Sequence, residues 1–377
     1  MNLYNSRILV TGANGFIGKN LIARLNDCSN VSVTTFLRND EYSLLPKLIS
    51  CVDAVIHLAG ENRPADVHAF DLVNAGLTNE LCNAIKQEWS SSGRRVSLLL
   101  ASSTQCERDT PYGRSKLAAE KYVRALANEI GNSCLIFRLP GVFGKWCKPN
   151  YNSVVATFCH NIARDLPIQI NDSTSELRLA YVDDVVTAFL TAIETAVPGC
   201  KDAYVQPEYT TNLIELAKQI RIFGESRFTL MTEQVGTGFI RALYATYLSY
   251  LPKEKFSYYL TKHSDPRGIF VEMLKTRDSG QFSYFTAHPG ITRGRHYHHT
   301  KSEKFLVIKG EALFRFRHLL SNELFELRTS GSVPQVVDSI PGWTHEITNV
   351  GSDEIIVLLW ANETFDRKNP DTIACEI

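Results

Sequence analysis

Up to about residue 200, short apolar runs alternate with stretches whose apolar residues follow helical spacing. The strand candidates lie at 7–11, 31–37, 53–58, 96–101 and 134–138. Continuous apolar runs are expected for strands that are buried on both faces, and their alternation with helices is typical of βαβ units. The N-terminal part is therefore predicted to be an α/β fold with a doubly wound parallel sheet.

From residue 263 onward the pattern changes to short alternating strands broken by Gly, Pro and Asn, as in 312–320 and 354–360. This pattern predicts an all-β sandwich or barrel. Between the two parts, 236–252 is rich in aromatic residues and predicts a helix or a pair of turns. The residues at helical spacing, which we expect to form a packing face, are Phe239, Leu243, Tyr247 and Tyr250.

A glycine-rich turn follows the first apolar run, with the spacing Gly12-x-x-Gly15-x-x-Gly18. A P-loop has four residues between its glycines, followed by Lys and Ser or Thr. Here five residues separate Gly12 from Gly18, and Asn20 stands where the hydroxyl residue is needed. The turn between a strand and a helix that begins near Phe16 instead fits a Rossmann-type dinucleotide site, whose glycines let the backbone approach a pyrophosphate. A glycine turn with only a structural role is the alternative.

Composition narrows the class of protein. Lys plus Arg and Asp plus Glu number 40 each among the 377 residues, so no basic field favours nucleic acid. No apolar run approaches the ~20 residues of a membrane-spanning helix, and no membrane association is expected. The first strand begins near Arg7, which leaves no room for a signal peptide. Nine cysteines without a CxxC pair indicate reduced thiols and a cytoplasmic location.

Tyr112 and Lys116 are four residues apart in PYGRSKLAAE, so a helix would place both side chains on one face. An ammonium group beside the phenol is expected to lower its pKa and to make it an effective proton donor. Upstream, the strand around 96–101 runs into hydroxyl residues, and Ser103 could hydrogen-bond the same substrate oxygen. Taken alone, a Tyr–Lys pair at this spacing is also common on protein surfaces.

Seven segments of the first half of the chain, taken in order, resemble the extended short-chain dehydrogenase/reductase family, in its branch that acts on nucleotide sugars. The segments are TGANGFIG (11–18), DAVIHLAG (53–60), Asn74 in LVNAGLTNE, ASST (101–104), YGRSK (112–116), FRLPGVFG (137–144) and LAYVDD (179–184). The resemblance implies an NADP-binding domain over residues 1–255.

The same resemblance implies that Tyr112 donates the proton, that Lys116 binds the nicotinamide ribose and that Ser103 orients the substrate carbonyl. Asn74 would support the active-site backbone or a proton relay. Arg138 is expected in a packing or ion-pair role, and Arg178 is a candidate for the substrate diphosphate. The residues expected to bind the cofactor are Gly12, Asn14, Gly15, Phe16, Ile17, Gly18, Arg38, Leu58, Ala59, Gly60, Asn74, Tyr112 and Lys116.

Two details refine the chemistry. The second strand is followed by Arg38 rather than by an acid that would hold a ribose 2′-OH, and an arginine there suits the 2′-phosphate of NADPH. Sugar 4,6-dehydratases of this family carry Asp-Glu after the strand-end Thr, whereas this chain has Thr104-Gln105-Cys106. Reduction of a ketone is therefore favoured over dehydration.

The stretch GITRGRHYHHTKSEKFLVIKG (290–310) carries His296 and His298, which a strand would direct to one face, followed by Glu303. Its spacing resembles the first cupin motif, and PGWTHEITN (341–349) resembles the second through His345, although Pro341 stands where a spacer is usual. Three imidazoles and one carboxylate suit a divalent first-row metal. We expect a metal-binding, all-β cupin barrel over 263–377. Surface histidines, or a sugar-binding barrel without metal, are the alternatives.

A further segment, SDPRGIFVEML (264–274), resembles the entry strand of deoxysugar 3,5-epimerase cupins, and the resemblance implies a phosphate contact for Arg267. Proton abstraction beside a ketone needs an electrophile for the developing oxyanion and a base near the carbon. The metal could be the electrophile. Candidates for the base are Tyr297, His299 and Lys301.

The whole chain resembles the bifunctional capsular-polysaccharide and O-antigen enzymes on the route to UDP-N-acetyl-L-fucosamine. The resemblance implies that the cupin epimerises C3 of a UDP-2-acetamido-2,6-dideoxy-4-hexulose. The first domain then reduces the C4 ketone with NADPH to UDP-N-acetyl-6-deoxy-L-talosamine. It further implies zinc as the metal and a homo-oligomer, dimer or tetramer. Three alternatives stay open: a single-activity reductase whose cupin binds sugar or joins subunits, a regulator with a dead site, and a redox-neutral 4-epimerase.

Overall fold

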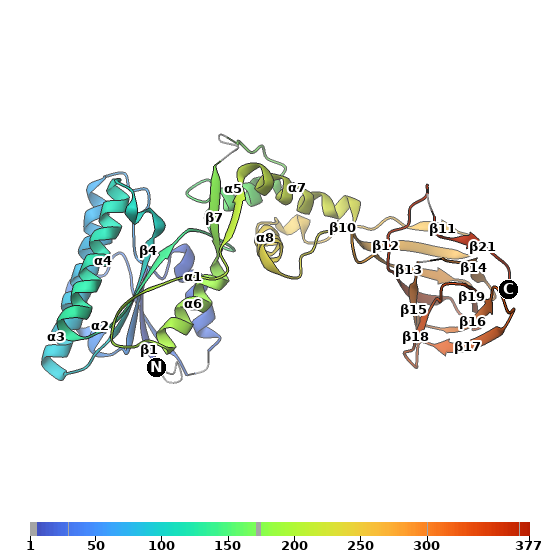
Figure 1. Ribbon diagram of the computed structural model, residues 1–377, viewed down its shortest axis with the longest axis horizontal. Coiled ribbons are helices and arrows are strands. Elements are labelled where there is room, and N and C mark those ends of the chain that lie inside the picture. The colour runs from blue at the N-terminus through green and yellow to red at the C-terminus, as the bar shows by residue number, and fades with distance from the viewer. Residues whose placement is uncertain (1–5, 29, 171–174, 300, 369) are drawn as a thin grey trace. The chain divides into compact units, whose positions relative to one another are not determined.

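The computed structural model describes residues 6–28, 30–170, 175–299, 301–368 and 370–377. The chain divides into two compact units, and Figure 1 shows their elements in chain order. Unit 1 comprises Met1–Ile220 and Ala242–Leu251, and unit 2 comprises Arg221–Arg241 and Pro252–Ile377. The units interleave in sequence, whereas the domains predicted above, 1–255 and 263–377, are contiguous.

Unit 1 is built on a parallel sheet with the strand order β2-β1-β3-β4-β5-β8. The strands are β1 (Arg7–Thr11), β2 (Ser32–Phe36), β3 (Ala54–His57), β4 (Ser97–Ser103), β5 (Ser133–Leu139) and β8 (Gly199–Ala203). The order reverses between β1 and β3, which is where ligands bind in doubly wound sheets. The predicted Rossmann-type α/β fold is confirmed.

Helices cover both faces of this sheet (Figure 1). They are α1 (Phe16–Asn26), α2 (Leu45–Ser50), α3 (Leu77–Ser92), α4 (Pro111–Ile130) and α6 (Val182–Glu194). Alternate residues of β1 point to opposite faces, so Ile8 and Val10 pack with α1 and α6, whereas Leu9 packs with α2, α3 and α4. Burial on both faces explains why the central strands β1, β3, β4 and β5 appear in the sequence as largely apolar runs.

A smaller sheet and further helices complete the part of the chain before residue 252. They are β6 (Gly141–Phe143), β7 (Glu176–Tyr181), β9 (Tyr209–Asn212), α5 (Val154–Ile162), α7 (Leu213–Thr229) and α8 (Gly238–Ser249). The packing face predicted for 236–252 is confirmed, because Leu243, Tyr247 and Tyr250 are buried and Phe239 is partly buried. Among the described residues, none of the helices combines the length and apolar character that a membrane crossing requires.

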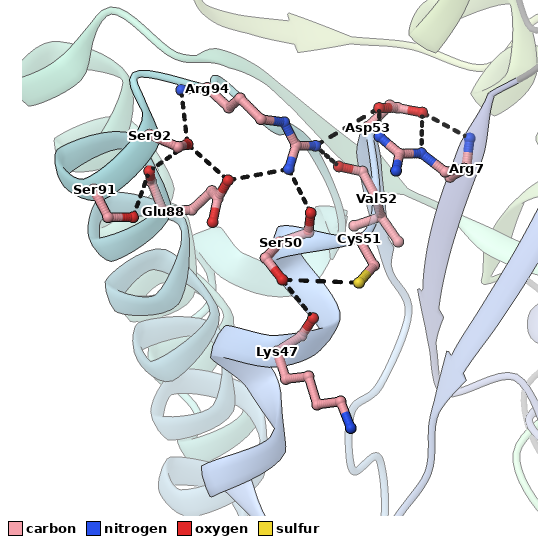
Figure 2. Close-up of polar contacts among 10 residues, drawn as sticks. All are labelled: Arg7, Lys47, Ser50, Cys51, Val52, Asp53, Glu88, Ser91, Ser92 and Arg94. Carbon is pink, nitrogen blue, oxygen red and sulfur yellow. Dashed lines mark hydrogen bonds and ion pairs between the residues drawn. The ribbon is translucent and has the colours of Figure 1, made fainter.

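Polar contacts stabilise the amino-terminal ends of β1 and β3, which lie opposite the strand ends that carry the predicted site (Figure 2). The guanidinium of Arg94 donates hydrogen bonds to the backbone oxygens of Ser50, at 2.5 Å, and Val52, at 2.6 Å. Asp53 accepts from the backbone and the guanidinium of Arg7, with the shortest bond at 2.7 Å. These contacts join the segment after α3 to the connection between α2 and β3, and thereby fix where β3 begins.

Unit 2 consists mainly of two facing β-sheets, ordered β10-β12-β13-β20-β15-β18, with β11 paired to β12, and β17-β16-β19-β14-β21. The strands are β10 (Met231–Thr232), β11 (His263–Asp265), β12 (Gly268–Thr276), β13 (Gln281–Ala287), β14 (Thr292–Tyr297), β15 (Glu303–Lys309), β16 (Glu311–His318), β17 (Leu324–Ser330), β18 (Val336–Asp338), β19 (Trp343–Asn349), β20 (Ile355–Ala361) and β21 (Ile373–Ala374). Phe285, Phe305, Phe314 and Ile347 fill the space between the sheets. The predicted all-β cupin fold is confirmed.

Candidate functional site

The glycine turn of unit 1 is shaped by close backbone contacts at the carboxyl end of β1. Gly12 has φ +70°, and a Cβ placed there would lie 2.7 Å from the backbone nitrogen of Ala59. A Cβ at Gly18 would lie 2.2 Å from the Gly12 oxygen, so only glycine allows α1 to pack this closely on the turn. Since α1 begins at Phe16, the free N–H groups of its first turn lie at the glycine turn, as a pyrophosphate site requires.

The second predicted cofactor segment, at the end of β3, lies against this turn. The backbone nitrogen of Ala59 donates to Thr11 Oγ1 at 3.1 Å. A Cβ at Gly60 would lie 3.1 Å from Lys116 Nζ and 3.0 Å from Asn74 Oδ1. The fold therefore brings the glycine turn, the loop after β3 and the predicted catalytic lysine to one edge of the sheet.

A cavity of about 720 Å³ lies beside the turn, between α1 and the end of β2. Its lining includes the predicted residue Asn14, Leu37 next to Arg38, and two residues that the sequence did not indicate, Lys19 and Trp146. Trp146 is 53% exposed. No motif in the sequence marks either residue.

The predicted catalytic group is assembled by β4 and α4. Tyr112 lies in the first turn of α4 and is hydrogen-bonded to Ser103, the last residue of β4. Lys116 lies one helical turn further on, is 6% exposed, and donates from Nζ to the backbone oxygen of Ala101 at 3.1 Å. The side chains predicted to act together thus converge, although they come from a strand and a helix.

The expectation that Lys116 lowers the phenol pKa is wrong. Burial raises the pKa of Tyr112, and the hydrogen bond from Ser103 only partly opposes this. Burial also lowers the pKa of Lys116 to about 8, against a smaller opposite influence of Glu120. The reason is that burial removes water from both groups, which disfavours the charged form of each.

Asn74 lies on a π-helical turn, η2 (Phe70–Gly76), a form often found at functional sites. Its Oδ1 accepts from the backbone nitrogen of Glu61 at 2.8 Å, and its Nδ2 donates to Ser115 Oγ at 3.0 Å. The ring of Phe70 contacts Tyr112 edge-on, with centroids 5.8 Å apart. Asn74 therefore links the loop after β3 to the residue that precedes Lys116.

His57, which the sequence analysis did not single out, links the end of β1 to the start of α3 through hydrogen bonds with Thr11 and Thr78. Thr78 Oγ1 donates to the backbone oxygen of Asn74 at 2.6 Å, so it accepts from His57 Nε2 at 2.9 Å. His57 Nδ1 then accepts from Thr11 Oγ1 at 2.6 Å. Burial lowers the pKa of His57 to about 3, which keeps the imidazole neutral in this chain of hydrogen bonds.

Helix α4 also carries a buried carboxylate, Glu120, which is 1% exposed. It accepts from Ser102 Oγ at 2.6 Å and from Arg138 Nη2 at 2.7 Å, while Arg138 also pairs with Glu107 at 2.8 Å. The predicted ion-pair role of Arg138 is confirmed. The ion pair holds α4 to β5, and the Ser102 bond holds α4 to β4, one helical turn beyond Lys116. Together they fix the height of the lysine above the sheet.

The two arginines predicted as phosphate contacts in unit 1 are both paired with acids. Arg38, whose side chain is 78% exposed, forms an ion pair with Glu61, the residue after Gly60. Arg178 on β7 pairs with Glu208, with 3.0 Å between Nη2 and Oε2. A phosphate at either position would compete with a carboxylate.

In unit 2 the predicted metal ligands converge. One ligand atom from each of His296, His298, Glu303 and His345 can be chosen so that all lie within 4.8 Å of one another. Glu303 Oε2 lies 3.2 Å from His298 Nε2 and 3.5 Å from His345 Nε2. Although Pro341 departs from the usual motif, His345 on β19 stands directly opposite His296 on β14.

These residues fit a cation chemically. In the described part of the chain, Nε2 of His296 and both ring nitrogens of His345 are buried without a hydrogen bond. Burial alone would raise the pKa of Glu303, but the three imidazoles and Lys301 hold it well below its usual range. Unsatisfied imidazole nitrogens around an ionised carboxylate form a donor set that suits a divalent first-row metal.

The three base candidates and the predicted phosphate contact Arg267 lie in different surroundings from one another. Lys301 is buried, with Nζ 2.9 Å from Glu303 Oε1, whereas Tyr297 and His299 contact each other, with ring centroids 5.4 Å apart. The guanidinium of Arg267 pairs with Asp265 at 2.6 Å. Of the three base candidates, Lys301 is therefore the one in direct contact with a predicted metal ligand.

A parallel sheet with a glycine turn and a Ser–Tyr–Lys group, followed by a cupin with a His₃Glu cluster, defines a class of two-domain nucleotide-sugar enzymes. The chain matches the model of the NAD dependent epimerase/dehydratase family over residues 8–205 and that of the polysaccharide biosynthesis C-terminal domain over 263–373. It belongs to the NAD dependent epimerase/dehydratase family.

Two relatives that align with nearly the whole chain show which members of this class it resembles. The chain is 54% identical over 371 residues to a UDP-2-acetamido-2,6-beta-L-arabino-hexul-4-ose reductase of Pseudomonas aeruginosa, covering 98% of this chain and 99% of that one. It is 41% identical to the capsular polysaccharide assembling protein CapF of Staphylococcus aureus, with a TM-score of 0.89 over 98% of this chain and 100% of CapF. The predicted resemblance to capsular-polysaccharide enzymes is confirmed.

More distant structures share the fold of the first part only. A UDP-glucuronic acid 4-epimerase from Bacillus cereus, solved with NAD, is 20% identical, with a TM-score of 0.50 over 57% of this chain and 83% of that one.

Proposed function

We propose that this protein is a bifunctional UDP-sugar enzyme of capsule or O-antigen synthesis. Unit 1 reduces the C4 ketone of a UDP-2-acetamido-2,6-dideoxy-hexulose, and unit 2 first inverts C3 of the same sugar. The product is UDP-N-acetyl-6-deoxy-L-talosamine, a precursor of UDP-N-acetyl-L-fucosamine. The name of the Pseudomonas relative supports the reductase and its substrate class.

The observation that carries the reductase is the convergence of Tyr112, Ser103 and Lys116 next to the glycine turn. The phenol of Tyr112 donates its proton to the ketone oxygen, and the Ser103 hydroxyl hydrogen-bonds the same oxygen and orients it. Lys116 carries positive charge next to the phenol and binds the ribose. NADPH would supply a hydride, which carries two electrons and one hydrogen. With the proton from Tyr112, the hydride converts the ketone to an alcohol.

We infer NADPH rather than NADH from Arg38, whose guanidinium follows β2 where a 2′-phosphate would lie. The Arg38–Glu61 ion pair shows that the guanidinium already turns toward the loop after β3. Gly12, Asn14, Gly15, Phe16, Ile17, Gly18, Leu58, Ala59, Gly60 and Asn74 complete the proposed cofactor site. Arg178 remains proposed for the sugar diphosphate.

The epimerase proposal is supported by the His₃Glu cluster and by Lys301 at its edge. A divalent cation there, which we propose to be zinc, would supply positive charge beside a carbonyl oxygen and so acidify the neighbouring C–H. His296, His298, Glu303 and His345 hold it, and Arg267 binds the diphosphate. Loss and return of a C3 proton needs no redox partner, but it needs the C4 ketone, so epimerisation must precede reduction.

Incubation of the purified chain with the UDP-4-ketosugar in D₂O, with and without NADPH, tests both halves. We expect deuterium at C3 in either case and loss of the ketone only with NADPH. Reduction without C3 exchange would favour a single-activity reductase whose cupin binds sugar or joins subunits. Conversion without net NADPH loss would favour a redox-neutral 4-epimerase, and no turnover would favour a regulator.

The remaining proposals concern the state of the protein in the cell. We expect a homo-oligomer, dimer or tetramer, which light scattering of the purified chain would measure. We also expect a cytoplasmic location and no nucleic-acid or membrane partner, since substrate and cofactor are water-soluble nucleotides.

A further inference from the structure

His298 has two ring nitrogens with different surroundings. Its Nε2 faces Glu303 at 3.2 Å, and its Nδ1 lies 2.5 Å from the backbone oxygen of Asp371. A carbonyl oxygen can only accept, so Nδ1 must carry the hydrogen. The lone pair of Nε2 is then directed at the predicted metal position, and the ring cannot rotate without losing this bond.

The side chain of Asp371 holds the backbone that follows His298 in the sequence. Its Oδ1 accepts from the backbone nitrogen of His299 at 2.9 Å, and its Oδ2 accepts from that of Lys301 at 2.8 Å. One residue therefore contacts the ring through its carbonyl and the following backbone through both carboxylate oxygens. These bonds tie the position of the Asp371 carbonyl to the backbone that carries His298.

We name residues 371–375, the segment that begins with Asp371, the strap. The strap runs alongside β14, the strand that bears His296. In β21, Ala374 pairs with His296 and Ile373 with Tyr297. The strap also reaches the strand of the third histidine, because Thr344 Oγ1, next to His345, donates to the backbone oxygen of Cys375 at 2.7 Å. The strap thus contacts residues next to each of the three imidazoles.

We propose that Asp371 is a positioning residue of the metal centre, which fixes the tautomer and orientation of His298. The inference rests on the proposed function, because it assumes that the cluster binds a metal. It goes beyond the ligand motif, since Asp371 lies 73 residues after His298 in sequence. Metal ligands commonly donate their second ring nitrogen to a carbonyl or carboxylate, and loss of such a partner weakens metal binding by roughly 10- to 100-fold.

The test uses the full-length chain, freed of metal, as wild type and as Asp371→Ala, Asp371→Asn and Asp278→Ala. Zn²⁺ affinity is measured by competition with a chromogenic chelator, and the Co²⁺-loaded proteins are compared by visible absorption. Asp278 is the matched control, an exposed aspartate in the loop before β13 that accepts from the side chain of Gln234.

We expect Asp371→Ala to weaken Zn²⁺ binding by up to about 10-fold, the lower end for loss of such a partner, because the backbone carbonyl remains but loses the two side-chain bonds that fix its position. At saturating Co²⁺ its spectrum should also change, because the carbonyl that orients the His298 ring is no longer fixed by the carboxylate. Asp371→Asn retains one acceptor oxygen and should lie between the wild type and Asp371→Ala, which keeps the test decisive should the alanine variant not fold. Asp278→Ala should match the wild type.

A purely structural role for Asp371 would lower the thermal midpoint but leave the saturated Co²⁺ spectrum unchanged. Wild-type Zn²⁺ affinity and an unchanged spectrum in both folded Asp371 variants would overturn the proposal and leave the metal centre intact. A wild-type chain that binds neither ion would overturn the proposal together with the metal centre on which it rests.

Discussion

The ammonium group of Lys116 donates a hydrogen bond of 3.1 Å to the backbone oxygen of Ala101, inside β4 and two residues before Ser103. The lysine is thereby held at the height of the strand end at which the ketone is proposed to bind. It is also nearly inaccessible to water, and this burial lowers its pKa to about 8.

The first prediction follows from this pKa. The ammonium is present below pH about 8 and is lost above it, so kcat/KM for ketone reduction should fall by about tenfold per pH unit on the alkaline side. Lys116→Arg should keep its charge throughout and lack this fall, at a lower overall rate. The check is a pH series of initial rates. A wild-type rate that stays constant to about pH 10 would contradict the assignment.

Replacement of Tyr112 by Phe should separate the two proposed activities. Without the phenolic proton, ketone reduction should slow by roughly 10²- to 10⁴-fold. C3 exchange should continue, because the His₃Glu cluster belongs to the other unit. The measurements are NADPH oxidation and deuterium incorporation on the same samples. Tyr122→Phe, which alters an exposed tyrosine of the same helix, is the control. A folded Tyr112→Phe variant that lost both activities would indicate one shared site.

Cofactor preference should depend on Arg38. Arg38→Ala should raise KM for NADPH by roughly 10- to 100-fold and leave KM for NADH nearly unchanged, because only the former carries a 2′-phosphate. Glu61→Gln frees the guanidinium from its ion pair and should act in the opposite direction. Arg24→Ala, at an exposed arginine of α1, is the control. Equal effects of Arg38→Ala on both cofactors would place the 2′-phosphate elsewhere.

Metal removal should abolish epimerisation alone. Treatment with a chelator, or His345→Ala, should reduce C3 exchange to background, because the C–H beside the ketone would then lack the positive charge that acidifies it. NADPH oxidation with the already epimerised ketosugar should persist. His288→Ala removes a half-exposed histidine of unit 2 that pairs with Glu354, and should have no effect on exchange. Full exchange in the metal-free protein would exclude a metal role.

The Arg94 contacts in Figure 2 predict a stability effect without a catalytic one. Arg94→Ala removes charge-assisted hydrogen bonds to the backbone oxygens of Ser50 and Val52, and should lower the free energy of unfolding by about 1–3 kcal/mol. Urea denaturation measures this change. Lys47→Ala, at an exposed side chain of neighbouring α2, should change stability by less than about 0.5 kcal/mol. A similar loss in both variants would show that the carbonyl contacts contribute little.

The sequence by itself determined features that depend on neighbours along the chain. Apolar runs separated by helical stretches predicted the parallel sheet, since strand burial depends on local hydrophobicity. The spacing of Gly12, Gly15 and Gly18 predicted a dinucleotide turn, because backbone approach depends on where side chains are missing. His296 and His298 predicted a shared face, since a strand repeats every two residues.

Only the tertiary structure decided what depends on residues far apart in sequence. It placed His57 between Thr11 and Thr78, paired Arg38 with Glu61, and brought Asp371 onto His298. It also reversed the expected pKa shift of Tyr112, because desolvation depends on everything that packs around the phenol and not on the lysine four positions away. Motifs encode which groups can react, whereas packing sets their charge, tautomer and orientation.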